Sequence, residues 1–273
     1  MANNSRASAA ALAEQIAAQY SELPQVTAVS LGGSLATKQS GADSDIDLYV
    51  YTVEDIPLDA RQAIAQSNAS QYEVDNQFWE SGDEWIDQTT GIHVDVMFRS
   101  THWIEEQINR ILLQHLASVG YSTCFWHNVS TSKILFDRVS WYAQLQVAAK
   151  RPYPPQLQQA IIAKNFPILR NTLSSYLYQI NSSMRRKDTV SLNHRIAALL
   201  ASYFDILFAL NELPHPGEKR LLHLATTQCK LQPNNMVEHI NHLLLASTED
   251  EDVPDRVNDL VDSLEELLRS YGA

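Results

Sequence analysis

The chain is poor in cysteine and has no hydrophobic run long enough to cross a lipid bilayer. Its two cysteines, Cys124 and Cys229, are far apart in the sequence, which argues against a disulfide or a metal site built on thiolates. The alanine-rich N-terminus is interrupted by Glu14 and Gln15, so it has no compact apolar segment typical of a signal peptide. These absences predict a cytoplasmic protein with reduced thiols and no membrane partner.

Positive charge is also scarce in the first half of the chain. Residues 1–140 carry 7 Lys and Arg against 18 Asp and Glu, a net charge of −11. Residues 141–230 carry 11 against 4, a net charge of +7, and residues 231–273 carry 2 against 10, a net charge of −8. An acidic cleft repels a phosphate backbone and attracts a cationic acceptor. We therefore expect a small cationic ligand rather than nucleic acid, while the basic segment either faces a triphosphate or an RNA or is a solvated surface.

The first half of the chain has the mixed pattern of a small α/β (α+β) domain. With 273 residues, 45% of them hydrophobic, the chain is long enough for one large domain or two modest ones. Strand patterns alternate with helical patterns, and residues 122–137 stay ambiguous. We expect strands at about 26–32, 45–52, 72–75 and 92–98, and helices at about 5–22, 58–69 and 101–116. The sequence thus predicts a mixed-sheet catalytic domain over residues 1–140.

The remaining part, residues 141–273, has a helical pattern throughout. A cluster of prolines at 152–155 indicates a linker or a helix start, and Pro167 is expected to kink or divide the helix that follows. Helices are expected at about 155–186, 189–212, 218–230, 234–246 and 253–270. Residues 197–208 are apolar on nearly every side, which is typical of the buried centre of a bundle. We therefore predict a second, all-α helical bundle domain that binds the substrate.

The most informative stretch of the chain is residues 32–47, GGSLATKQSGADSDID. A strand-like run leads into Gly33 and Ser34, and a polar loop then leads to Asp45 and Asp47. Side chains alternate along a strand, so the two carboxylates are expected on one face, where their charges repel unless a cation lies between them. Oxygen ligands of this kind suit Mg²⁺, and glycine lets the backbone approach a phosphate closely. The stretch therefore predicts metal-dependent chemistry on a nucleoside triphosphate.

This stretch resembles the signature of the DNA polymerase β-like nucleotidyltransferase superfamily, because Ser34 is followed eleven residues later by Asp45-Ile46-Asp47. The resemblance implies a third carboxylate on a later strand, and Asp95, flanked by valines, is the first choice, with Glu73 or Asp75 as rivals. A helical bundle after the sheet resembles the small-molecule branch, which includes aminoglycoside and lincosamide nucleotidyltransferases. Antibiotic inactivation is the best-known role of that branch.

The resemblance implies transfer of a nucleoside monophosphate, AMP from ATP in the first instance, to a hydroxyl of a small acceptor, with release of pyrophosphate. Asp45, Asp47 and Asp95 would be the catalytic residues and the ligands of one or two Mg²⁺ or Mn²⁺ ions, with Asp95 acting as metal ligand, general base or both. Gly33 and Ser34 would bind the nucleotide, together with Lys219, which follows a Pro-Gly turn and is expected to open a helix.

Three further residues are candidates for the substrate pocket, namely His93, Glu73 and Asp205. Each also has a structural interpretation. His93 would be a surface histidine and Glu73 a solvated strand residue. Asp205 would be a carboxylate paired with Arg195 or His194 inside an apolar helix. Two other functions stay open: a nucleotidyltransferase that modifies protein or tRNA, of the toxin–antitoxin type, and a non-catalytic nucleotide-binding relative. Oligomeric state is undetermined, and a homodimer formed through the helical domains is compatible with the sequence.

Overall fold

The computed structural model of the chain describes residues 2–36, 45–78 and 80–272. The chain forms two compact units, the first comprising residues 1–109 and 128–151 and the second comprising residues 110–127 and 152–273. The boundary is therefore interleaved, because a segment of the helical unit precedes the last strand of the sheet. The assignment of catalysis to residues 1–140 and of substrate binding to residues 141–273 stays a prediction.

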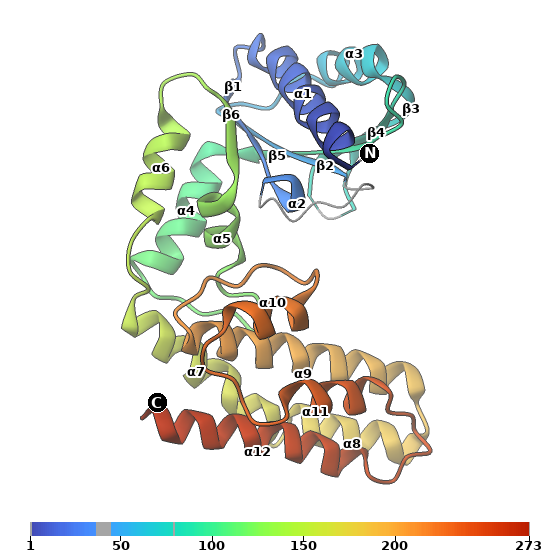
Figure 1. Ribbon diagram of the computed structural model, residues 1–273, viewed down its shortest axis with the longest axis vertical. Helices are drawn as coiled ribbons and strands as arrows, with labels where there is room; N and C mark the ends of the chain where they lie inside the picture. Colours follow the sequence, from blue (N-terminus) through green and yellow to red (C-terminus); the bar gives the residue numbers. More distant parts are fainter. Residues whose placement is uncertain (1, 37–44, 79, 273) are drawn as a thin grey trace. The chain divides into compact units, whose positions relative to one another are not determined.

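Within the described residues, the first unit is built on a six-stranded mixed sheet (Figure 1). The strands are β1 (Val26–Leu31), β2 (Ile46–Thr52), β3 (Ala69–Asn76), β4 (Gly82–Asp87), β5 (His93–Ser100) and β6 (Lys133–Asp137). Their order is β3-β4-β5-β2-β1-β6, with the central pair β2 and β5 parallel and the other neighbours antiparallel. The mixed α/β class expected from the sequence is confirmed.

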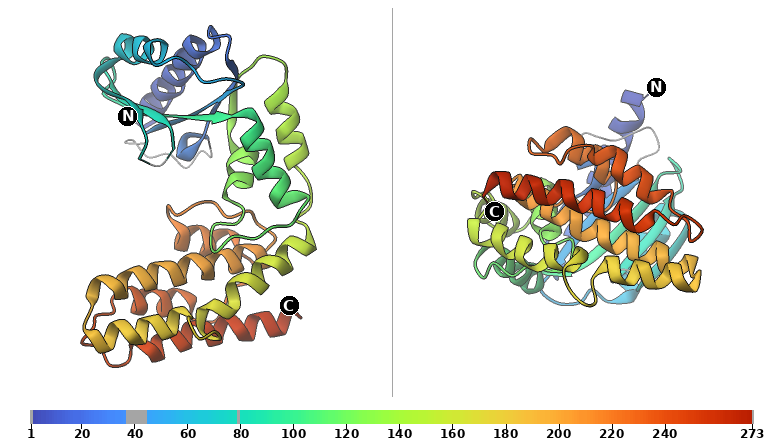
Figure 2. Two further views of the ribbon diagram at one scale, coloured as in Figure 1. Left: turned by 180° about the vertical axis from the view of Figure 1, so that it is seen from behind. Right: turned by 90° about the horizontal axis from the view of Figure 1, so that it is seen from below.

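The two faces of this sheet carry different residues, because side chains alternate along each strand. In β2, Ile46, Leu48 and Val50 are fully buried against α1 (Ala2–Ser21) and α3 (Leu58–Asn68). We call this side the α1 face; Figures 1 and 2 show both helices on it. Residues between them in the sequence point to the other side, which we call the opposite face. There the sheet meets α2 (Gly33–Ala36) and α6 (Trp141–Ala149).

The second unit is a bundle of helices packed around α9 (Thr189–Leu210). Residues 202–210 are all buried, as expected from a segment that is apolar on nearly every side. Figure 2 shows the helices of this unit from two further sides. The other helices are α4 (Thr101–Leu112) and α5 (Cys124–Thr131), each shared between the units, and α7 (Pro155–Arg170), α8 (Tyr176–Arg186), α10 (Leu221–Gln228), α11 (Met236–Leu244) and α12 (Val253–Tyr271). The structure therefore confirms a helical region after the sheet.

Several elements differ from those expected. Strand β4 was not predicted, because its acidic residues Asp83 and Asp87 are buried where an apolar pattern would be expected. Helix α6 was also missed, and the ambiguous segment 122–137 forms α5 and β6. The long helix expected after the proline cluster ends at Arg170, whereas Pro167 lies inside α7 rather than at the break.

The polar loop expected at 37–44 lies outside the described ranges. Both cysteines are free, Cys124 half-buried and Cys229 buried. None of the helices in the described ranges combines the length and hydropathy needed to span a membrane.

Candidate active site

Carboxylates from four strands lie side by side on the opposite face of the sheet. Asp47 of β2 pairs in parallel register with Asp95 of β5, so both side chains leave the same face. Asp95 is paired in turn with Glu84 of β4, and Glu84 with Glu73 of β3. We call Asp47, Asp95, Glu84 and Glu73 the acidic row. Directly paired residues have Cβ atoms about 4.5–5.5 Å apart, and like charges in such pairs are destabilising.

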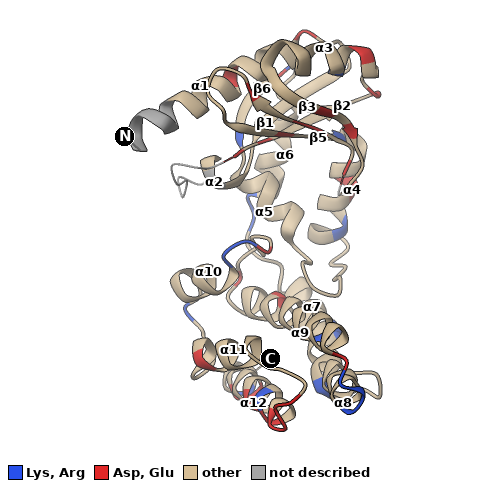
Figure 3. Cartoon of the chain, turned by 90° about the vertical axis from the view of Figure 1, so that its right-hand side faces the viewer, with Lys and Arg blue, Asp and Glu red and all other residues tan. Residues whose placement is uncertain are grey.

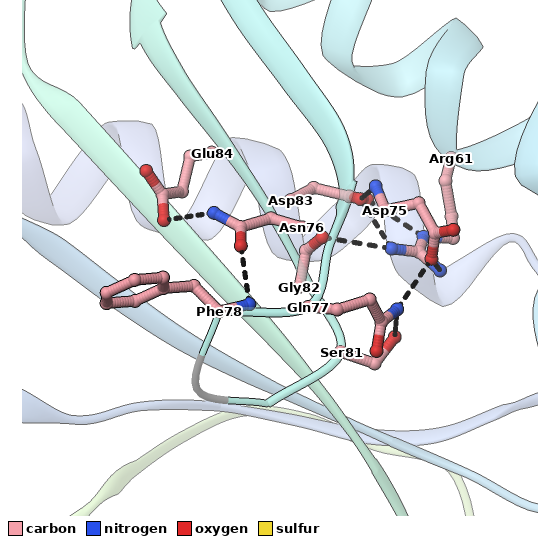
Figure 4. Close-up of polar contacts among 9 residues, drawn as sticks. All are labelled: Arg61, Asp75, Asn76, Gln77, Phe78, Ser81, Gly82, Asp83 and Glu84. Carbon is pink, nitrogen blue, oxygen red and sulfur yellow. Dashed lines mark hydrogen bonds and ion pairs between the residues drawn. The ribbon is translucent and has the colours of Figure 1, made fainter.

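Glu84 is the member of this row that sequence analysis missed. It is held by Asn76, whose Nδ2 donates to Glu84 Oε1 at 2.8 Å, and the two lie together in Figure 4. His93 Nε2 lies 3.8 Å from Glu84 Oε2, and both side chains are about two-fifths exposed, at 41% and 38%. The candidate pocket residues His93 and Glu73 are therefore both next to Glu84. Recognising β4 as a strand would have identified Glu84, because side chains alternate along a strand and Glu84 therefore points away from the face on which Asp83 is buried.

The glycine motif and the Asp47 strand are in direct contact. Gly33 has a φ of +62°, and a Cβ placed on it would lie 1.9 Å from Asp47 Oδ2, so only glycine fits here. Gly32 donates its amide to the carbonyl of Asp47 at 2.8 Å. Ser34 follows in α2, and its side chain is outside what the structure describes. The two parts of the signature, separated by a loop in sequence, thus meet at the Asp47 carboxylate.

Asp45 differs from the other two predicted catalytic acids. It is exposed and lies one residue before β2 begins, so it is not held by the sheet. Across the described ranges, no three or more His, Cys, Asp or Glu side chains are gathered closely enough to hold a metal ion. The neighbouring pair Asp47 and Asp95 nevertheless has the chemistry that suits Mg²⁺, which binds through one or two carboxylates and the phosphates of its substrate. The metal-ligand role of all three acids stays a prediction.

A buried arginine supports the strand beside the acidic row. Arg99 of β5 makes a bidentate ion pair with Glu80, at 2.7 and 2.9 Å, and donates to Asn128 Oδ1 at 2.9 Å. Its guanidinium carbon lies 4.1 Å from the ring centroid of Tyr49, two residues from Asp47. Burial raises the pKa of Tyr49 to about 12, so this phenol stays neutral at physiological pH.

The predicted phosphate ligand of the helical unit, Lys219, is exposed. It lies in the turn before α10, which begins at Leu221, because Arg220 adopts a φ of +60°. The expectation that Lys219 opens a helix is therefore wrong by two residues. Its contact with a triphosphate stays a prediction.

Asp205 is buried inside α9, with 1% of its surface exposed. It accepts hydrogen bonds from the amide and hydroxyl of Ser122, at 3.0 and 2.6 Å, and from Asn165 Nδ2 at 3.3 Å. These partners are neutral, whereas the sequence pointed to Arg195 or His194. Burial raises the pKa of Asp205 from 3.8 to about 6. Its contacts are those of a structural carboxylate that ties α9 to the residues before α5.

The chain was also compared with known proteins. Residues 13–116, which include β1–β5 and the whole acidic row, match the family model of the nucleotidyltransferase domain. Among curated proteins, no sequence matches the chain significantly.

Similar solved structures include a nucleotidyltransferase-like protein from Exiguobacterium sibiricum (15% identity, TM-score 0.44, covering 94% of this chain and 73% of that one). A second is the STING-associated CdnE c-di-GMP synthase from Capnocytophaga granulosa (14% identity, TM-score 0.32, covering 99% of this chain and 82% of that one). A third is the Thermotoga maritima CCA-adding enzyme complexed with tRNA (12% identity, TM-score 0.33, covering 95% of this chain and 80% of that one). Likenesses this distant identify neither the acceptor nor the nucleotide. The domain match assigns residues 13–116, with the acidic row, to a nucleotidyltransferase domain, and it supports nucleotidyltransferase activity.

Proposed function

We propose that this enzyme transfers AMP from ATP to a hydroxyl group of a small cationic acceptor and releases pyrophosphate. The observation that carries the proposal is the parallel register of Asp47 and Asp95, with Gly33 packed against the Asp47 carboxylate. Two carboxylates on neighbouring strands, beside a glycine that leaves backbone accessible, are suited to a metal-bound triphosphate.

Each residue has a separate role in this proposal. Asp47, with Asp45, would hold Mg²⁺ against the triphosphate, and Gly33 and Ser34 would bind its phosphate oxygens. A bound divalent cation neutralises charge on the triphosphate and lowers the pKa of a coordinated hydroxyl. Asp95 is assigned to the acceptor hydroxyl, as its proton acceptor or as a second metal ligand. The hydroxyl oxygen forms a bond to the α-phosphorus, and the bond from that phosphorus to pyrophosphate breaks.

The acceptor class follows from charge. Glu84 and Glu73 extend the row beyond the two aspartates, and in the first unit acidic residues line the strands (Figure 3). Carboxylates beyond those needed for metal binding favour amines on the acceptor and disfavour a phosphate backbone. An aminated sugar or a related polyamine alcohol fits this requirement, because it supplies both the ammonium groups and the hydroxyl.

The test uses ATP labelled at the α-phosphate or at the γ-phosphate, with Mg²⁺ and a panel of aminoglycosides and amino sugars. We expect label from the α-phosphate alone to appear in the acceptor. Asp47→Asn should lower the rate by at least about a hundredfold, which is about 2.7 kcal/mol of activation free energy. Asp59→Asn is the matched control, because Asp59 is an exposed aspartate of α3 whose side chain, among the described residues, accepts only from the neighbouring amide of Ala60.

Transfer of the γ-phosphate would instead identify a kinase reaction. Equal rates for Asp47→Asn and the control, with both variants folded by circular dichroism, would remove the acidic row from catalysis. Adducts on tRNA or protein but on no small molecule would favour the macromolecular acceptor.

A further inference from the structure

A hollow of the first unit lies where β2 and β5 end. It has a volume of about 400 Å³, within the range of about 300–1,000 Å³ typical of small-molecule sites. Its lining residues come from β2, the turn before α3, α3 itself, the β3–β4 hairpin and β5: Thr52, Asp55, Ile56, Leu58, Arg61, Asp75, Gln77, Ser81, Phe98 and Ser100. We call it the hairpin pocket.

The hairpin pocket is separate from the acidic row, because it opens on the other side of the sheet. Thr52 pairs with Ser100 and lies an even number of residues from the buried Leu48, so its side chain leaves the α1 face. Asp47 and Asp95 leave the opposite face. A ligand in the pocket therefore has the sheet between itself and the proposed reaction site.

The one cation of the pocket is already neutralised. Arg61 is buried and makes a bidentate ion pair with the fully buried Asp83, at 3.0 and 2.5 Å. Its guanidinium carbon also lies 4.2 Å from the ring centroid of Phe98. Asp75 lies 3.7 Å from Arg61 and is 46% exposed, as Figure 4 shows on the right of the hairpin. Asp55 makes no hydrogen bond or ion pair with any described residue. The pocket is therefore lined by two carboxylates, Asp55 and Asp75, and by one cation whose charge is already balanced by the buried Asp83 behind it.

Two features of this polar lining indicate a ligand-binding site. Thr52 is only 6% exposed, lines the pocket, and its hydroxyl has no hydrogen-bond partner among the described residues. Asp75 has a φ of +65°, which is uncommon for a non-glycine residue, at a bulge of the β3–β4 ladder. Its amide donates to Asp83 Oδ1 at 3.0 Å and Gln77 donates to its carboxylate at 2.8 Å, so the strained residue is fixed at the rim.

We propose that the hairpin pocket binds a small organic cation, a primary amine with a short carbon chain. Asp55 and Asp75 take its ammonium groups, and the hydroxyl of Thr52 completes their hydrogen bonds. The apolar side chains of Ile56 and Phe98 pack on the carbon chain. A second ammonium fits the second carboxylate, so a four-carbon diamine is the natural probe.

The test measures binding of 1,4-diaminobutane by isothermal titration, with 1,4-butanediol as the neutral compound of matched length. We expect saturable binding of the diamine at one site and none of the diol. Asp55→Asn should weaken diamine binding at least tenfold, since it removes a carboxylate without removing a structural contact. Glu54→Gln is the matched control, because Glu54 is the exposed neighbour of Asp55, loses the same charge and does not line the pocket.

A third variant separates this site from the proposed reaction site. Asp47→Asn should leave diamine affinity unchanged, because Asp47 lies on the opposite face of the sheet. Diamine binding lost in Asp47→Asn and kept in Asp55→Asn would place the ligand at the acidic row and overturn the inference. The inference would also be overturned if Asp55→Asn and Glu54→Gln bound the diamine equally well, or if the unmodified chain did not bind it. Neither result would bear on AMP transfer.

Discussion

The two faces of the sheet hold carboxylates in opposite ways, and β4 shows both within two adjacent residues. Asp83 points to the α1 face, where it is fully buried and paired with Arg61. Glu84 points to the opposite face, where its register neighbours are the acids Asp95 and Glu73. One carboxylate has a cation built into the fold, whereas the other has been placed beside like charges.

This difference distinguishes carboxylates that stabilise the fold from carboxylates that we propose bind substrate or metal. A buried ion pair whose members complete each other leaves nothing for a ligand, and removing one member exposes the cost of burying the other. Like charges placed opposite one another cost stability, and a bound cation reduces their repulsion. Arg61 and Asp83 therefore hold α3 onto the sheet, whereas the acidic row is where we propose that metal, nucleotide and acceptor bind.

Breaking the ion pair should have the largest effect on stability. Arg61→Met leaves Asp83 buried without its partner, and we expect the free energy of unfolding to fall by about 3–5 kcal/mol in urea. Arg61→Met with Asp83→Leu should recover most of this loss. Arg110→Met, at an exposed arginine of α4, is the control. A loss below about 1 kcal/mol for Arg61→Met would mean that the two faces do not differ in this way.

Asp205 provides a third environment for a carboxylate, because it is buried and its hydrogen-bond donors among the described residues, Ser122 and Asn165, are neutral. Its folded pKa of about 6 lies above the ordinary value of 3.8, so the folded state keeps a proton that the unfolded state has lost. Stability from this group is therefore present below about pH 4 and lost as the pH rises to about 6. The shift of about two pKa units corresponds to about 2–3 kcal/mol. Asp205→Asn should remove this dependence, measured as the difference in unfolding free energy from the unmodified chain between pH 4 and 7. A difference that does not change with pH would contradict a raised pKa.

The smallest effect is expected at the acidic row itself. Glu84→Gln removes one of the like charges and keeps an oxygen that accepts from Asn76, so stability should rise by about 0.2–1 kcal/mol at low salt. The gain should shrink as salt is added, because these side chains are partly exposed. Thermal unfolding at two ionic strengths measures it. Gln71→Glu, which adds a charge at another exposed position of β3, is the reciprocal control, and a loss of stability in Glu84→Gln would show that the row is already compensated.

Much of the six-stranded sheet could be predicted from the sequence, because its strands β1, β2 and β5 alternate or run apolar, as buried strands must. β2 and β5 also carry the acids Asp47 and Asp95, so strand and motif were found together. Strand β4 could not be found in this way, since Asp83 faces the interior and is tolerated only because Arg61 is brought to it from α3. With β4 hidden, Glu84 and the hairpin pocket were hidden too.

By itself the sequence determined the strands β1, β2 and β5, the acidic character of the first half and the motif spacing that indicates the chemistry, because these depend on periodicity and on residue type. The tertiary structure alone decided which acids are neighbours. Strand register set Asp95 beside Asp47 and added Glu84, and the start of β2 left Asp45 outside the sheet. Register depends on backbone hydrogen bonds between segments distant in the chain, so no local pattern of residues reports it.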